Sequence, residues 1–270
     1  MSVLLHLSDL HFGTERAPVV EALKSFVHER RPSLAILSGD ITQRATVDEF
    51  RAARRFIDAL GVPRVLAIPG NHDLPLFNLP LRVWAPYARY SAAFGTQRSP
   101  SHLDEELLVA CVDTTRWWRH KDGQVSRRQI EGVEAQLAQT DATRLRIVVV
   151  HQPVCVTRER DRTNLLHGRE AALRRWVAAG ADLVLGGHIH LPYVCPLSEH
   201  ITGLARRAFA VQAGTAVSNR LRHEAGNSVN LIHLVARTAS DRSCRIERWD
   251  YGETSGRFDR AATHELRLDP

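Results

Sequence analysis

The chain has 270 residues, of which 44% are hydrophobic, 24% charged and 6% aromatic. This globular composition excludes a disordered chain, a coiled coil and a collagen-like repeat, and no apolar run approaches the roughly 18 residues that cross a bilayer. The net charge of +6 is compatible with polyanionic partners such as nucleic acid or nucleotides, but a general bias towards arginine as the surface cation is the favoured explanation.

Apolar runs of strand length recur along the chain. Those in the first two thirds lack a clean alternation, which predicts strands covered on both faces. They are Val3–Leu7, Leu34–Leu37, Arg64–Ile68, Leu107–Val112, Arg146–Val150 and Leu183–Leu185. Further strands are expected at Phe209–Gln212, Val229–Val235 and Arg245–Trp249, with no helices between them.

Helical patterns separate the early strands. Val19–Arg30 has apolar residues at three-to-four spacing, and Gly168–Ala179 is a second helical segment. Capping boxes begin two more helices, one at Thr46 that ends before Gly61 and one at Ser126 that runs to about Gln139. Strand–helix alternation predicts an α/β fold with parallel pairing, and the C-terminal strands suggest a second sheet packed on the first. The proline-rich stretch 74–100 is expected to cover a site.

Polar side chains follow five of the predicted strands directly. The carboxyl ends of strands in open α/β sheets are where ligands bind, so these residues are expected at one edge. The segments are Asp9-Leu10-His11, Gly39-Asp40, Gly70-Asn71-His72-Asp73, His151 and Gly187-His188-Ile189-His190.

Metal chemistry explains this mixture of carboxylate, amide and imidazole. Asp9 and His11 are two residues apart, so in an extended segment they point the same way and share an ion; His188 and His190 have the same spacing. The two oxygens of Asp40 make it a suitable bridge between two ions. An oxygen and nitrogen ligand set of this kind favours manganese, iron or zinc over magnesium or calcium.

These five motifs, in this order, resemble those of the calcineurin-like metallophosphoesterases. Within that superfamily the chain is most similar to the bacterial class III cyclic-nucleotide phosphodiesterases, through Val112-Asp113-Thr114, Gly123-x-x-Ser126 and Ala213-Gly214-Thr215. The resemblance implies a four-layer αββα sandwich of two mixed β-sheets flanked by helices. It implies a single domain over 1–270, with motifs over 5–190 and C-terminal strands of the second sheet over about 207–250.

The resemblance also implies a role for each motif residue. The first ion would be held by Asp9, His11, Asp40 and His190, and the second by Asp40, Asn71, His151 and His188. His72 would contact the phosphate or protonate the leaving oxygen, and Asp73 would orient His72. Mixed iron and manganese is the centre that the family implies, with zinc as the alternative, and a metal-bridging hydroxide would attack phosphorus.

A small phosphodiester is the expected substrate, with a 3′,5′-cyclic nucleotide as the leading hypothesis. The alternatives are an Mre11-like nuclease, a UDP-sugar-lipid pyrophosphatase and a binding scaffold that has lost catalysis. The loop from Arg116 to His120 places Trp117 and Trp118 between cations, and either stacks on a base or simply packs between a strand and a helix.

Four dispersed cysteines without a Cys-x-x-Cys pair favour a reducing, cytoplasmic setting. No membrane partner is expected. The sequence leaves a homo-oligomer open.

Overall fold

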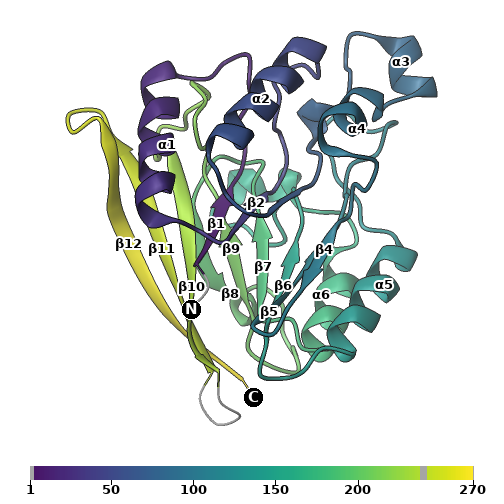
Figure 1. The fold of residues 1–270 in the computed structure, drawn as a ribbon. Helices are drawn as coiled ribbons and strands as arrows, with labels where there is room; N and C mark the ends of the chain where they lie inside the picture. The colour runs from purple at the N-terminus through teal and green to yellow at the C-terminus, as the bar shows by residue number, and fades with distance from the viewer. Residues whose placement is uncertain (1–2, 238–241, 270) are drawn as a thin grey trace.

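The computed structural model describes residues 3–237 and 242–269. Two six-stranded mixed sheets pack face to face, and helices cover the outer face of each, which confirms the expected αββα sandwich (Figure 1). None of the helices in these residues is long and apolar enough to cross a membrane.

The first sheet has the order β12-β11-β10-β1-β2-β3. Its parallel part consists of β1 (Val3–Leu7), β2 (Leu34–Leu37) and β3 (Val65–Ala67). Its antiparallel part, at the left of Figure 1, consists of β10 (Ser228–Arg237), β11 (Arg242–Gly252) and β12 (Arg257–Leu268).

The second sheet has the order β4-β5-β6-β7-β9-β8. The parallel centre contains β5 (Leu107–Cys111), β6 (Leu145–Val149), β7 (Leu183–Gly186) and β9 (Phe209–Gln212). The antiparallel edges are β4 (Ser101–Leu103) and β8 (Tyr193–Pro196).

The predicted helices form close to their expected bounds. Helices α1 (Ala17–Arg30) and α2 (Val47–Ala59) cover the first sheet, and α5 (Arg127–Ala138) and α6 (Arg169–Ala178) cover the second (Figure 1). Both predicted capping boxes are present, at Thr46 and Ser126. The stretch 74–100 contains the short helices α3 (Leu79–Trp84) and α4 (Ala88–Phe94).

The main core lies between the two sheets. Fully buried side chains from β1 and β2, such as Leu4 and Ile36, meet those of β6 and β7, such as Ile147 and Leu185. Their neighbours along each strand face the helices, which explains why these strands are apolar at successive positions.

The expected division of strands between the sheets was wrong for the C-terminal part. The strands over 207–250 do not build the second sheet together: β9 joins it, but β10 and β11 pair with β1 in the first sheet. Strands β4, β8 and β12 were not predicted from the sequence. Strand β12 is an edge strand with one face in solvent, so Arg257–Leu268 has no apolar run that marks it.

His6 provides a pH-dependent contribution to stability. Burial lowers the pKa of His6 to about 3, although the charge of Asp9 opposes this effect. The unfolded chain therefore takes up a proton between about pH 6.5 and 3 that the folded chain does not, and stability falls as the pH falls.

Glutamine at position 6 can still hydrogen-bond to Ser38. We expect His6→Gln to make the free energy of unfolding fall less steeply with decreasing pH, by about 1.4 kcal/mol per pH unit below pH 6.5. Denaturant unfolding of metal-free protein at several pH values measures the slope, with His28→Gln at an exposed position as the control. An unchanged slope in His6→Gln would refute the assignment.

Candidate metal centre

The seven predicted metal ligands lie together at one edge of the sandwich, beyond the carboxyl ends of five strands. Asp9 and His11 follow β1, Asp40 follows β2, and Asn71 follows β3. His151 follows β6, and His188 and His190 follow β7. Three groups of ligand atoms within 4.8 Å of one another form there: Asp9, His11 and His190; His11, Asp40 and His72; and Asp40, His151 and His188.

The backbone reaches this arrangement through a left-handed conformation that the sequence analysis did not anticipate. Asp9 (φ 52°) and His11 (φ 44°) are not in an extended segment as expected, and the same holds for His188 (φ 73°) and His190 (φ 55°). Asp40 also has a positive φ of 50°. Such residues are strained, and their concentration at one place is typical of a functional site.

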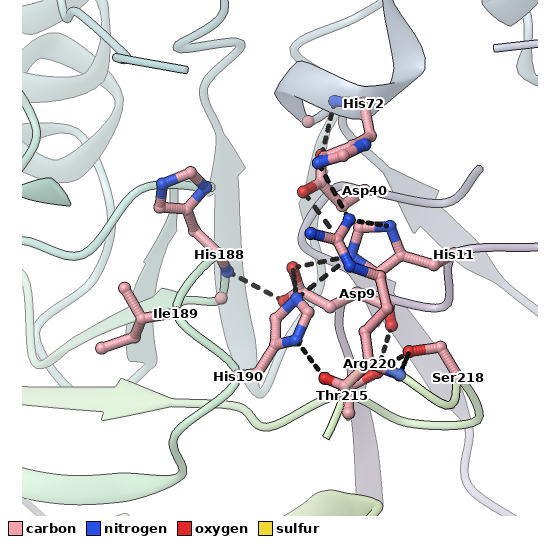
Figure 2. Close-up of polar contacts among 12 residues, drawn as sticks. Asp9, His11, Asp40, His72, His188, Ile189, His190, Thr215, Ser218 and Arg220 are labelled. Atoms are coloured by element: carbon pink, nitrogen blue, oxygen red, sulfur yellow. Dashed lines mark hydrogen bonds and ion pairs between the residues drawn. The ribbon is translucent and has the colours of Figure 1, made fainter. Parts of the chain in front are cut away.

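The first donor set converges on one point (Figure 2). Asp9 Oδ1 lies 3.2 Å from His190 Nε2 and 3.7 Å from His11 Nε2, and the two histidine nitrogens are 3.1 Å apart. The other Asp9 oxygen accepts a hydrogen bond of 2.8 Å from the backbone of His188. That bond fixes the carboxylate so that Oδ1 faces the two imidazoles.

The second donor set surrounds His151. Its Nε2 lies 3.3 Å from Asp40 Oδ1 and 3.3 Å from Asn71 Oδ1. The imidazole of His188 lies against that of His151, with ring centroids 5.1 Å apart.

Two histidines of these sets are held by backbone carbonyl groups. His151 Nδ1 donates to Ser38 O at 2.7 Å, and His190 Nδ1 donates to Arg220 O at 2.6 Å. These bonds place the proton on Nδ1 and leave Nε2 free as a ligand atom. A histidine that ligates a metal is normally oriented in this way.

The donor atoms fit cations. Asp9 Oδ1 and His188 Nδ1 are buried and make no hydrogen bond within the described part of the chain. Burial lowers the pKa of His151, but the charges of Asp40 and Asp9 and the hydrogen bonds to Asp40 and Ser38 together raise it to about 9. Burial likewise raises the pKa of Asp40, yet the surrounding histidines, His151, His72 and His11, together hold it well below its usual range. Buried carboxylates here require positive charge, which bound metal ions would supply.

His72 lies beside both sets. Its Nδ1 donates to Gln43 O at 2.9 Å, and its Nε2 accepts a hydrogen bond of 3.0 Å from Arg220 Nη1, because a guanidinium can only donate. Nε2 therefore faces the site (Figure 2).

Asp73 does not orient the His72 ring, as the resemblance implied. Its carboxylate is buried and accepts hydrogen bonds from the backbone of Gly70, Ile41 and Thr42 and from the Thr42 hydroxyl. It thus ties the loop after β3 to the loop after β2, and the carbonyl of Gln43 orients His72 instead.

A cleft of about 500 Å³ opens over the donor sets. Four of the polar residues that line it were not predicted from the sequence, because no metal-ligand pattern marks them: Lys121, Asn164, Arg220 and Arg222. Arg222 is paired with Asp161 at 3.0 Å. Within residues 3–237 and 242–269, no carboxylate forms an ion pair with Lys121 or Arg220.

Most of the Arg116–His120 loop lies at a separate hollow. Only His120 lines the cleft, whereas Arg116, Trp117 and Trp118 line a hollow of about 480 Å³ beside Arg98. Arg116 donates to Gln129 and to the backbone of Thr115 and is held in place, whereas Trp117 and Trp118 are 41% and 59% exposed, so the packing interpretation does not extend to the two tryptophans.

Gly187 is required where the chain passes Asp9. A Cβ atom at Gly187 would collide with Ser8 Oγ and lie 2.5 Å from Asp9 Oδ2. We expect Gly187→Ala to displace the Asp9 carboxylate and to weaken metal binding by about 10- to 100-fold. Manganese titration measures the affinity, with Gly132→Ala as the control because its Cβ would meet nothing within 4 Å. Equal affinity in both variants would contradict the prediction.

Comparison with known proteins gives a consistent result. A sequence model described as calcineurin-like phosphoesterase matches residues 2–192. The chain is 34% identical over 84 residues to glycerophosphodiester phosphodiesterase GpdQ of Enterobacter lignolyticus (strain SCF1), covering 26% of this chain and 29% of that protein. It is 23% identical over 201 residues to the probable cyclic nucleotide phosphodiesterase syc0937_d of Synechococcus sp., covering 71% of this chain and 74% of that protein.

The fold is similar to that of a dimetal phosphatase from Danio rerio. The TM-score is 0.65 and the sequence identity 14%, with 99% of this chain and 98% of that chain covered. The chain therefore spans nearly the whole of that structure, but less than a third of the GpdQ relative.

Proposed function

The chain belongs to the calcineurin-like phosphoesterase family and is a metal-dependent phosphoester hydrolase, and on this premise we propose that it is a two-metal phosphodiesterase acting on a small substrate, a 3′,5′-cyclic nucleotide. The family of dimetal phosphatases implies two metal ions. Manganese and iron suit the nitrogen and oxygen donors, and zinc is the alternative.

The placement of Asp40 carries the proposal. Its Oδ1 faces His151 at 3.3 Å, whereas its Oδ2 faces His11 at 3.8 Å. One carboxylate thus contributes an oxygen to each donor set, as a bridging ligand does. Asp9, His11 and His190 would complete one site, and Asn71, His151 and His188 the other. Two ions held there supply Lewis acidity and lower the pKa of a bound water towards neutrality.

The cleft provides the charge that an anionic substrate needs. Lys121 and Arg220 line it without a carboxylate partner among the described residues, so they are available to a phosphate group. Its volume of about 500 Å³ falls in the range of small-molecule sites. These two features support a mononucleotide-sized phosphodiester.

Arg220 would bind the phosphate. Its Nη1 now contacts His72 Nε2 at 3.0 Å, Gln43 Oε1 at 3.1 Å and, more distantly, His11 Nδ1 at 3.4 Å. A non-bridging phosphate oxygen is a better acceptor than these neutral groups, because it carries charge. When Arg220 turns to the phosphate, His72 Nε2 is free to take up a proton from solvent and to pass it to the leaving oxygen.

We expect Arg220→Gln to raise KM by about 10- to 100-fold with a smaller effect on kcat, since a charge-assisted hydrogen bond to the bound phosphate is lost. Steady-state kinetics with manganese measures both constants. Arg128→Gln, at an exposed position of α5, is the control. A normal KM in Arg220→Gln would exclude the phosphate contact.

A substrate panel with Mn²⁺ tests the proposed function. It contains cyclic AMP and cyclic GMP, nucleotide monoesters, glycerophosphodiesters, single-stranded DNA and a UDP-sugar lipid. The proposal expects the highest kcat/KM for a cyclic nucleotide. A preference for single-stranded DNA would favour the nuclease, and a preference for the UDP-sugar lipid would favour the pyrophosphatase. No turnover of any substrate, together with less than one bound ion per chain, would favour the binding scaffold.

A further inference from the structure

A second group of metal-binding side chains lies in the apolar layer that packs on the outer face of the second sheet. Cys155 lies in the loop after β6, Cys195 lies in β8, and His200 follows the short 3₁₀ helix Leu197–Glu199. The ligand atoms of these three residues are within 4.8 Å of one another. The two sulfur atoms are 3.2 Å apart.

The two thiols are buried, with exposed fractions of 3% for Cys155 and 7% for Cys195. Either thiol can donate to the other, and this contact lowers the pKa of Cys195 and raises that of Cys155. The backbone is fixed there because the Tyr193 hydroxyl donates to Cys155 O at 2.6 Å. Two soft donor atoms are therefore held next to each other, where a thiophilic cation can bind both.

A cavity connects this group with solvent. Its volume is about 280 Å³, and Cys155, Arg162, Glu170 and His200 are among the residues that line it. Both cysteines are buried, whereas His200 is exposed. The cavity supplies both a route for an ion and room for a water molecule as fourth ligand.

We propose that Cys155, Cys195 and His200 form a binding site for a thiophilic divalent cation, with Zn²⁺ as the expected ion. Zinc takes two thiolates and an imidazole in tetrahedral geometry at about 2.3 Å from sulfur, which places the two sulfur atoms about 3.8 Å apart. Rotation of one cysteine side chain provides the separation. Zinc displaces one proton from each thiol, and the two thiolates then neutralise its charge within the apolar layer.

The position of this site suggests a structural role. Cys155 lies four residues after His151, and Cys195 five residues after His190. An ion shared by the two cysteines would therefore join the segments that carry one ligand of each donor set. A disulfide between the two cysteines would not involve His200, whereas a metal ion would bind all three ligand atoms, which lie within 4.8 Å of one another.

Cobalt substitution tests the proposal, because thiolate ligands give an intense charge-transfer absorption that nitrogen and oxygen ligands do not. We expect metal-free protein titrated with Co²⁺ under reducing conditions to show this band with an intensity that corresponds to one thiolate-bound ion per chain, besides the two ions of the main centre, and Zn²⁺ to remove it. Cys155→Ser and Cys195→Ser should each abolish the band. Cys111→Ser and Cys244→Ser, two other buried cysteines, are the matched controls and should retain it.

If a cysteine variant does not fold, His200→Gln provides a second test, because His200 is exposed and its substitution should leave the fold intact. We expect it to weaken cobalt binding at this site at least about tenfold. The proposal is overturned if wild-type protein shows no thiolate band, if the band survives in the double variant of Cys155 and Cys195, or if these residues are recovered as a disulfide without bound metal. The band does not depend on the ligands of the main centre. Its absence would therefore refute the second metal site without affecting the proposed phosphodiesterase function.

Discussion

Replacing Asp40 with alanine is expected to abolish phosphodiester hydrolysis, with a loss in kcat/KM of at least about 10⁴-fold. The reason is geometric: Oδ1 faces His151 and Oδ2 faces His11, so a single substitution removes a ligand from both donor sets. It also removes the acceptor of the His72 backbone N–H, at 2.8 Å, which helps to hold the loop after β3. Activity and bound metal should fall together.

Turnover at saturating substrate and metal content after gel filtration are the measurements for Asp40→Ala. Asp48→Ala is the matched control, because that carboxylate lies on the surface of α2 and pairs with Arg51. Asp40→Ala protein that retains two ions and turns over normally would refute the bridging role.

His72→Gln is expected to lower kcat by about 10²- to 10⁴-fold for substrates with an alkoxide leaving group, while metal content is retained. His72 is held by Gln43 O with Nε2 towards the cleft, so this nitrogen is placed to deliver a proton. Glutamine keeps a donor at this position but cannot supply the proton. An activated aryl phosphodiester needs no protonation of its leaving group and should lose less than about tenfold.

The ratio of the two rates is the informative quantity for His72→Gln. A purely structural role would slow both substrates equally, and that result would count against proton donation. His28→Gln provides the control for the loss of a histidine at the surface of α1.

Much of the fold was predictable because its signals are local. Buried strands such as Val3–Leu7 and Leu34–Leu37 are continuous apolar runs, and Thr46 and Ser126 begin their helices with capping boxes. The position of β10 beside β1 depends on contacts more than 200 residues apart in the chain, such as Val3 with His233. Such pairing has no local pattern, which is why β10 and β11 were assigned to the wrong sheet, whereas β9 was assigned correctly.

The site shows the same division. The predicted ligands follow strands, and parallel strands bring their carboxyl ends together, so Asp9 and Asp40 could be placed at one edge from sequence alone. The left-handed backbone conformation of Asp9 and His11 could not be predicted from the sequence, because a strained conformation is imposed by the surrounding structure. Arg220 was missed because no metal-ligand pattern marks it, and only the folded chain brings it to His72.

The central claim is that seven side chains hold two metal ions that share Asp40. Anomalous diffraction from a crystal of manganese-loaded protein tests it most directly. We expect two anomalous peaks about 3.5–4 Å apart, one on each side of the Asp40 carboxylate, with Asp9, His11 and His190 around one and Asn71, His151 and His188 around the other. A single peak, or two peaks away from Asp40, would contradict the account.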